Sequence, residues 1–260
     1  MKIIVCIKQV PDAKDVRLDP ITNTLAREGV QSIMNPYDQH ALEEAVRLKE
    51  KCGGEVIVMT MGPPQAEEVL RQAISCGADD AILISDRAFA GADTWATAYT
   101  LEHALKQIGV FDLILCGKQA IDGDTAQVGP GLATRLGIPY MTCVQKIRET
   151  TESGLVVERM MDDGCDVVAV DYPALLSVVK DINEPRVPSI KGKMKAKKAD
   201  IIKFNAQSIG ADPACIGLPG SPTKVVNVFP PAARGERSVL TGTLDEQIDQ
   251  LVEKLLPYLQ

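Results

Sequence analysis

The strongest restriction on the fold is an alternation of short apolar runs and amphipathic stretches of helical period between residue 2 and about residue 140. The apolar runs lie at residues 3–10, 56–61, 81–85 and 113–116. Because each run is almost continuously hydrophobic, the runs are typical of parallel strands that are buried on both faces and joined by crossover helices. We therefore predict an α/β fold with a doubly wound, mostly parallel sheet. In such a sheet, ligands bind outside the carboxyl ends of the strands.

Three helices are predicted between these strands. The first begins at Pro36, directly after Asn35, and stops at Gly53-Gly54. The second covers about residues 65–76 and the third covers residues 94–108, and a glycine follows each of them. A proline in the first turn and a glycine after the last turn are the usual signals of helix ends.

After residue 140 the pattern changes to closely spaced strands. Predicted strands at residues 155–160, 165–170 and 174–179 indicate an antiparallel extension of the sheet. Residues 181–241 then show little periodicity, many prolines, among them Pro230 and Pro231, and a run of lysines. A structureless stretch of that length favours an arm that docks on a partner chain. An arm that packs back on its own core is the alternative.

A last helix is predicted at residues 244–259. Four apolar side chains recur on one side of it at helical spacing, namely Ile248, Leu251, Val252 and Leu255. We expect this helix to anchor the arm.

Composition excludes several classes of protein. The 28 basic and 35 acidic residues give a net charge of −7, which disfavours nucleic acid as a partner. No apolar run approaches the ~18 residues of a membrane span, so no membrane insertion is expected. The seven cysteines are scattered without a CxxC pair, which predicts neither a disulfide framework nor a metal site. These features are typical of a reduced, cytoplasmic protein.

The glycine loop, which we define as residues 117–131, is the segment richest in potential chemistry. It follows the last clear strand and opens a helix, where free N–H groups favour an anion. It matches neither a phosphate-hydrolysing loop nor the common dinucleotide fingerprint. The loop therefore favours binding of a pyrophosphate without hydrolysis, and a purely structural glycine loop is the alternative. The strand ends at residues 10–12 and 61–64 are expected at the same edge.

Side chains for acid–base catalysis are scarce. His40 and His103 fall inside predicted helices without a nucleophile nearby, which favours structural roles. Four close carboxylates are typical of solvated turns rather than of a paired-carboxylate hydrolase, namely Asp122, Asp124, Asp162 and Asp163. Asp93 is placed to cap a helix. We predict no catalytic side chain, so that any redox chemistry belongs to a cofactor.

Several long motifs of the chain resemble the β subunit of electron-transfer flavoproteins. They are Met34-Asn-Pro-Tyr-Asp38 with residues 41–49, Gly117-Lys-Gln-Ala-Ile-Asp122, and the stretches 157–164, 183–186 and 194–198. The resemblance covers essentially the whole chain. It implies a heterodimer whose α subunit carries one FAD, while the β subunit holds a second adenine nucleotide, either AMP or FAD.

The resemblance also implies which residues touch that nucleotide. They lie at the strand ends identified above and in the glycine loop. They are Cys6, Asn35, Pro36, Tyr37, Asp38, Met61, Phe89, Asp93, Thr94, Thr97, Asp122, Gly123, Asp124, Thr125, Ala126, Gln127, Val128, Gly129, Pro130, Gly131 and Thr134.

Residues 122–130, with 10–12 and 89–95, look like those of the flavin-bifurcating group. For that group the resemblance implies FAD, which accepts a hydride from NADH. One electron then passes through the α-subunit FAD to an acyl-CoA dehydrogenase type partner, and the other passes to ferredoxin or flavodoxin. The alternatives are a non-bifurcating β subunit that holds structural AMP and, in another class, a stand-alone ATP- or AMP-binding regulatory module.

The recognition segment, residues 183–198, matches the loop by which the family contacts its dehydrogenase partner. Ile190 stands where an apolar residue fills a pocket of the partner, which is worth ~1.5–3 kcal/mol by buried area. The lysines, Lys195 among them, would add electrostatic steering that salt weakens. The chain then divides into a nucleotide-binding domain at 1–180, a partner-recognition loop at 181–200 and a C-terminal arm at 201–260.

Overall fold

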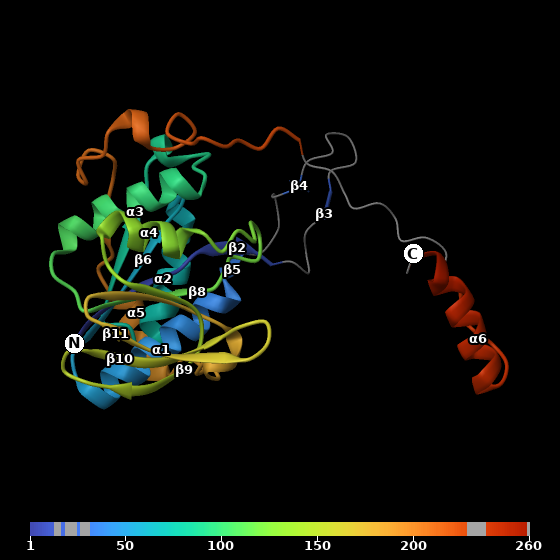
Figure 1. Cartoon of the computed structure of the whole chain (residues 1–260). Helices are drawn as coiled ribbons and strands as arrows, with labels where there is room; N and C mark the ends of the chain where they lie inside the picture. Colours follow the sequence, from blue (N-terminus) through green and yellow to red (C-terminus); the bar gives the residue numbers. More distant parts are fainter. Residues whose placement is uncertain (13–16, 19–24, 27–31, 228–237, 259–260) are drawn as a thin grey trace.

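The apolar runs form the middle of one large sheet. The computed structural model describes residues 1–12, 17–18, 25–26, 32–227 and 238–258. Within these residues lies a nine-stranded sheet of order β11-β10-β9-β12-β8-β1-β6-β7-β13 (Figure 1). Its strands are β1 Lys2–Cys6, β6 Glu55–Met61, β7 Asp80–Ile84, β8 Leu113–Gly117, β9 Tyr140–Thr150, β10 Gly154–Met160, β11 Cys165–Asp171, β12 Ala174–Val178 and β13 Ile202–Phe204. In this spatial order, each pair of neighbouring strands from β9 across to the edge strand β13 is parallel. Strand β10 pairs antiparallel with both β9 and β11. The predicted α/β fold is confirmed.

Helices cover both faces of the sheet (Figure 1). They are α1 Pro36–Cys52, α2 Glu67–Ser75, α3 Thr94–Ile108, α4 Val128–Leu136, α5 Ile190–Lys198 and α6 Leu244–Leu255. One core cluster packs α1, α2 and α5 on one face, and a second packs α3 and α4 on the other. Since side chains alternate along a strand, Ile3 and Val5 of β1 enter the first cluster while Ile4 enters the second. Burial on both faces explains the continuous hydrophobicity of these strands.

Short elements complete the described part of the chain. The 3₁₀ turns are η1 Pro64–Ala66, η2 Arg87–Phe89, η3 Lys180–Ile182, η4 Pro213–Cys215 and η5 Leu256–Tyr258. Two small ribbons pair β2 Gln9–Pro11 with β5 Ser32–Met34, and β3 Arg17–Leu18 with β4 Leu25–Ala26. The helices predicted from residue 36 and at 94–108 are confirmed. The helix predicted at about 65–76 begins two residues later, at Glu67, because residues 64–66 form η1.

Two strand predictions were wrong in part. The run 3–10 is not one strand, because after Cys6 the backbone leaves the sheet and Lys8 bonds instead to α1 and the residue before it. The strand predicted at 174–179 does not belong to the antiparallel extension. It forms β12, whose five residues are all buried between β8 and β9 in the parallel sheet. Antiparallel pairing comes instead from β9, whose alternating polar residues concealed a strand.

The stretch after residue 181 is also more ordered than predicted. The lysine-rich residues form α5, which buries only Ala196 against the body of the protein and therefore shows little apolar periodicity. Arg71 of α2 donates to the carbonyl of Ala196 at 2.6 Å. Strand β13 then pairs with β7 at the edge of the sheet. The prediction of a structureless stretch over residues 181–241 was therefore wrong for α5 and β13. Pro230 and Pro231 lie outside the described residues.

Helix α6 stands apart from the sheet and its covering helices (Figure 1). It begins at a capping box of Thr243 and Glu246, and none of its residues is buried. The four apolar side chains predicted on one side are 45–50% exposed. The predicted helix is confirmed as far as Tyr258, since η5 continues it, whereas Leu259 lies outside the described residues. Its role as an anchor stays a prediction.

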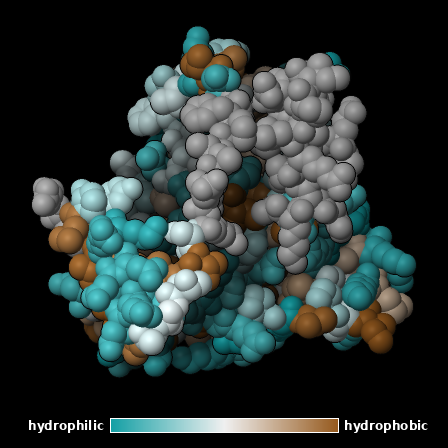
Figure 2. All heavy atoms as spheres, turned by 90° about the vertical axis from the view of Figure 1, so that its right-hand side faces the viewer, coloured by the Kyte–Doolittle hydropathy of each residue, from teal (hydrophilic) through white to brown (hydrophobic). Residues whose placement is uncertain are grey.

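Apolar side chains also reach the surface elsewhere. On the face shown in Figure 2, hydrophobic residues form separate patches among hydrophilic ones. Among the described helices, none combines the length and the apolar character that a bilayer crossing needs.

Candidate functional site

The candidate site lies at the carboxyl ends of β1 and β8. From β1 the chain continues to β6 and β7 on one side of it, and then returns to β8 on the other side. This change of direction is the switch point at which doubly wound sheets bind ligands. Cys6 and Cys116 are in register across it. The loop after β1 and the glycine loop after β8 therefore lie on the two sides of the switch point, where sheets of this kind form a ligand crevice, and we call them the two walls of that crevice.

The first turn of α1 ties these two walls together. The Asp38 carboxylate accepts from the backbone N–H of Lys8 at 2.7 Å and of Gly117 at 3.0 Å. The Asn35 amide donates to the carbonyl of Gln119 at 2.9 Å and accepts from the N–H of Ile121 at 3.2 Å. These bonds join residues 30 to 86 positions apart in the chain.

A third tie links the walls directly. The ammonium of Lys8 lies 2.7 Å from the Asp122 carboxylate. Both groups are partly exposed, so this pair contributes little stability. Lys8 was not predicted as a site residue, although a cation that interrupts an apolar run was a signal for it. Gly117 was quoted only as part of a motif.

Gly117 allows the close approach of α1. A Cβ atom at this position would lie 2.5 Å from both the Asp38 carboxylate and the Cβ of Tyr37. Pro36 and Tyr37 are half-buried in the same first turn, and the Lys180 ammonium lies 4.8 Å from the centre of the Tyr37 ring.

Asp38 is 5% exposed, and this burial raises the pKa of its carboxyl group to about 7. The hydrogen bonds from Lys8 and Gly117 act in the opposite direction, because they favour the charged form. Burial also raises the pKa of the Cys6 thiol to about 12 and that of Cys116 well above its usual range. Neither thiol is therefore a thiolate nucleophile at neutral pH.

The raised pKa predicts how Asp38 affects stability. The ordinary value is 3.8 and the folded value is about 7, so the folded state binds the extra proton between them. The contribution of Asp38 is therefore full below the unfolded pKa and is lost as the pH rises through the folded one. In urea unfolding, the stability of the protein relative to Asp38→Asn should fall between about pH 4 and about pH 7 and level off above that range. A difference that stays constant over that range would contradict this assignment.

The glycine loop offers backbone donors at the mouth of the crevice. Asp124 and Ala126 have positive φ angles of 53° and 54°. Within the described part of the chain, no acceptor bonds to the backbone N–H groups of residues 125–129, which lead into α4. Alternating backbone conformations of this kind, at the positive end of a helix dipole, form a site for an anion. The loop therefore fits a phosphate or diphosphate group.

The structure brings most of the predicted site residues to this edge. Asp122, Gly123, Asp124, Thr125, Ala126, Gln127, Val128, Gly129, Pro130 and Gly131 form the second wall and the start of α4. A Cβ on Gly129 would lie 2.9 Å from the Cys116 sulfur, so α4 starts directly on the strand end. Thr134 lies one turn later and donates to the Pro130 carbonyl at 2.8 Å. Met61 is half-buried at the end of β6.

The start of α3 joins the same edge. The Thr94 hydroxyl lies 3.4 Å from the side-chain oxygen of Gln127, and Thr97 is half-buried in the first turn of α3. Phe89 is only 5% exposed and belongs to the core cluster beneath α3 and α4. Its side chain therefore supports the edge from below.

Asp93 has structural partners on both carboxylate oxygens. It caps α3 by accepting from the N–H groups of Trp95 and Ala96, as predicted. Its other oxygen accepts from the backbone N–H and the hydroxyl of Thr223, at 3.0 and 2.9 Å. These bonds hold the chain at Thr223 next to the start of α3. No sequence signal pointed to Thr223, which lies 130 residues away.

The recognition segment lies against the later turns of α1. Asn183 and His40 exchange hydrogen bonds of 3.0 and 2.9 Å. Arg186 bonds to Glu43, which is 4% exposed, and to the more exposed Glu50. Burial raises the pKa of Glu43, but the hydrogen bonds from Arg186 and Arg47 outweigh it and hold that pKa below its usual value.

The two predicted partner-binding residues differ in exposure. Ile190 is 83% exposed at the start of α5, and Val187 beside it is 85% exposed. The Lys195 ammonium instead donates to the carbonyl of Ala78 at 2.9 Å and lies 3.7 Å from Asp79. Lys195 therefore holds α5 on the body of the protein.

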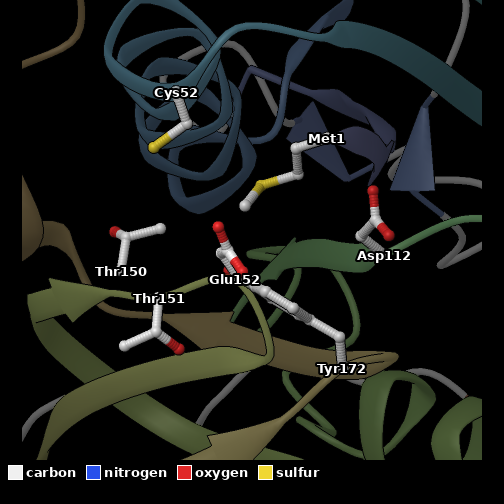
Figure 3. Close-up of a pocket in the computed structure, with 7 residues that line it drawn as sticks. All are labelled: Met1, Cys52, Asp112, Thr150, Thr151, Glu152 and Tyr172. Atoms are coloured by element: carbon white, nitrogen blue, oxygen red, sulfur yellow. The ribbon is translucent and has the colours of Figure 1, made fainter.

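A separate cavity of about 540 Å³ lies at the amino ends of the strands. Figure 3 shows side chains from the N-terminus, the end of α1, the β9–β10 turn and the β11–β12 turn around it, among them Met1, Cys52, Glu152 and Tyr172. The Tyr172 hydroxyl has no hydrogen-bond partner in the described structure. No His, Cys, Asp or Glu cluster suited to a metal occurs in the described ranges. His103, like His40, bonds to a backbone carbonyl.

Comparisons with known proteins agree with this architecture. Residues 22–209 match the family described as electron transfer flavoprotein domain. The chain is 50% identical to the electron transfer flavoprotein subunit beta of Thermoanaerobacterium thermosaccharolyticum over 256 residues, 98% of each chain. It is also 50% identical to the caffeyl-CoA reductase-Etf complex subunit CarD of Acetobacterium woodii over 257 residues, again 98% of each chain. Protein FixA of Bradyrhizobium diazoefficiens is 45% identical over 98% of this chain and 91% of its own.

Proposed function

The chain belongs to the electron transfer flavoprotein family as a β subunit that serves electron transfer beside an α subunit, and we propose from this premise that it holds FAD at the carboxyl edge of its sheet. The observation that carries the proposal is the row of backbone N–H groups at residues 125–129, at the switch point, to which no acceptor bonds among the described residues. These groups would hold the diphosphate. Cys6 and Met61, at the ends of β1 and β6, would offer apolar surface to the rings.

FAD bound here would supply the redox chemistry, by taking electron pairs from NADH and dividing them between two acceptors. We propose ferredoxin or flavodoxin as one acceptor. The other would be an acyl-CoA dehydrogenase type flavoenzyme, reached through the α-subunit FAD. Two observations support this assignment: the glycine loop resembles that of the bifurcating group, and one relative is named as a subunit of a caffeyl-CoA reductase-Etf complex. The residues of this chain have a binding and orienting role.

We further propose that the recognition segment and the C-terminal arm contact other proteins. Ile190 and Val187 present exposed apolar side chains to a dehydrogenase, while Arg186 and Asn183 fix the segment on α1. Helix α6 would place its half-exposed apolar side on the α subunit. All seven cysteines are free thiols, which supports a reduced, cytoplasmic setting.

Cofactor analysis of the heterodimer purified with its α subunit tests the proposed cofactor. We expect two FAD per heterodimer, and we expect NADH to bleach part of the flavin absorbance. One FAD and one AMP, without bleaching by NADH, would refute FAD at this site and favour a non-bifurcating β subunit. The count follows from extraction and chromatography of the nucleotides, so it does not depend on a redox partner.

A further inference from the structure

Two side chains at the start of α1 are almost fully buried although resemblance places them at the nucleotide. Asn35 is 1% exposed and Asp38 is 5% exposed. Every polar atom of these two side chains has a backbone partner in the loop after β1 or in the glycine loop. Their hydrogen-bonding capacity toward a ligand is therefore largely used within the protein.

Within the residues that the structure describes, few other contacts hold the two walls of the crevice at a fixed separation. The Lys8–Asp122 pair joins them directly, but its side chains are 48% and 31% exposed and it is therefore weak. The buried bonds from Asn35 and Asp38 are stronger constraints, because breaking them leaves unsatisfied groups inside the protein. We infer that Asn35 and Asp38 are positioning residues, which set the separation of the two walls and act on the nucleotide through those walls rather than by contact.

Small displacements of the walls matter because the donors at residues 125–129 follow Ile121 within a few positions. A ligand group held by several N–H groups loses most of its binding when they shift by about 1 Å. The first turn of α1 thus shapes a site that its side chains do not reach. The inference rests on the proposed nucleotide site only in its ligand-binding measurements.

Hydrogen exchange of the heterodimer, first without nucleotide, tests the positioning role directly. The side chain of Asn35 bonds directly to one wall only, the glycine loop, and otherwise to Asp38, so Asn35→Ala should accelerate exchange most, about tenfold, in peptides covering residues 117–125. Asp38 bonds to both walls, so Asp38→Asn should accelerate residues 7–12 as well. Asp80→Asn is the matched control, since Asp80 is exposed at the opposite end of the sheet.

Nucleotide binding is then measured with AMP and with FAD as separate probes. Both variants should weaken both probes by similar factors, at least about fivefold, and should change the visible circular dichroism of bound FAD, whereas Asp80→Asn should not. Weaker binding with wild-type exchange in the nucleotide-free complex would show direct contact and overturn the inference. Faster exchange throughout the sheet, or no change in either measurement, would also overturn it. If neither probe binds the wild type, the proposed function fails, while the exchange result still decides the positioning role.

Discussion

Gly117→Ala is expected to lower the free energy of unfolding by about 2–3 kcal/mol and to reduce nucleotide retention more than tenfold. A methyl group at this position would lie 2.5 Å from the Asp38 carboxylate and 2.7 Å from the backbone of Tyr37. Neither neighbour can retreat easily, because Asp38 is fixed by two backbone bonds and Tyr37 is part of α1. The glycine loop must therefore move away from α1. Urea unfolding and nucleotide content of the purified heterodimer measure the two effects.

Gly123→Ala is the matched control for stability in the same loop. No atom lies within 4 Å of a Cβ built on Gly123, so we expect a change in unfolding free energy within about 0.5 kcal/mol. Any loss of nucleotide in this variant would then reflect contact with the ligand and not a displaced loop. Equal losses of stability in the two variants would show that the packing of Gly117 against α1 is not what holds the loop.

Glu43→Gln is expected to destabilise the protein by about 3 kcal/mol. The Glu43 carboxylate is 4% exposed, and it lies 2.8 Å from the Arg186 guanidinium and 2.6 Å from that of Arg47. Replacing the carboxylate with an amide removes the negative charge that compensates the two arginines. The NH₂ group of the amide would also face one of these guanidinium groups, donor against donor. We also expect weaker binding of a dehydrogenase partner, because Arg186 fixes the recognition segment.

Glu50→Gln makes the same chemical change against the same arginine at an exposed site. The Glu50 carboxylate lies 2.6 Å from Arg186, but its side chain is 56% exposed. Surface pairs of this kind contribute about 0–1 kcal/mol. Unfolding in urea at neutral pH compares the two variants. If both cost the same, burial does not explain the strength of the Glu43 contacts.

Sequence patterns predicted those parts of the fold that depend on local signals. The strands near residues 56–61 and 113–116 were predictable because burial on both faces makes them continuously apolar. The ends of α1 and α3 followed from the proline, cap and glycine signals at their termini. Helix α5 escaped prediction because it buries only Ala196. The place of β12 depends on its neighbours β8 and β9, and no single segment specifies them.

The candidate site was predictable in position but not in its internal contacts. The strand ends and the glycine loop meet at the switch point, as topology requires. The bonds that shape the site join distant residues, such as Asp38 with Gly117 and Asp93 with Thr223. A single sequence, read by itself, carries no signal of such distant pairs. The resemblance grouped these residues as a nucleotide site. The structure shows that the side chains of Asn35, Asp38 and Asp93 already form hydrogen bonds with backbone groups of the protein.

Helix α1 holds two remote segments at once, and this fixes its rotational phase. Its first turn forms hydrogen bonds with the crevice walls through Asp38. Its later turns form hydrogen bonds with the recognition segment through His40 and Glu43. Each residue of an α-helix turns the chain by about 100° and advances it by ~1.5 Å. A single insertion or deletion between Asp38 and Glu43 would swing one set of contacts to the wrong side. The helix can therefore tolerate substitutions on its exposed face, but it cannot tolerate a change in the number of residues between Asp38 and Glu43.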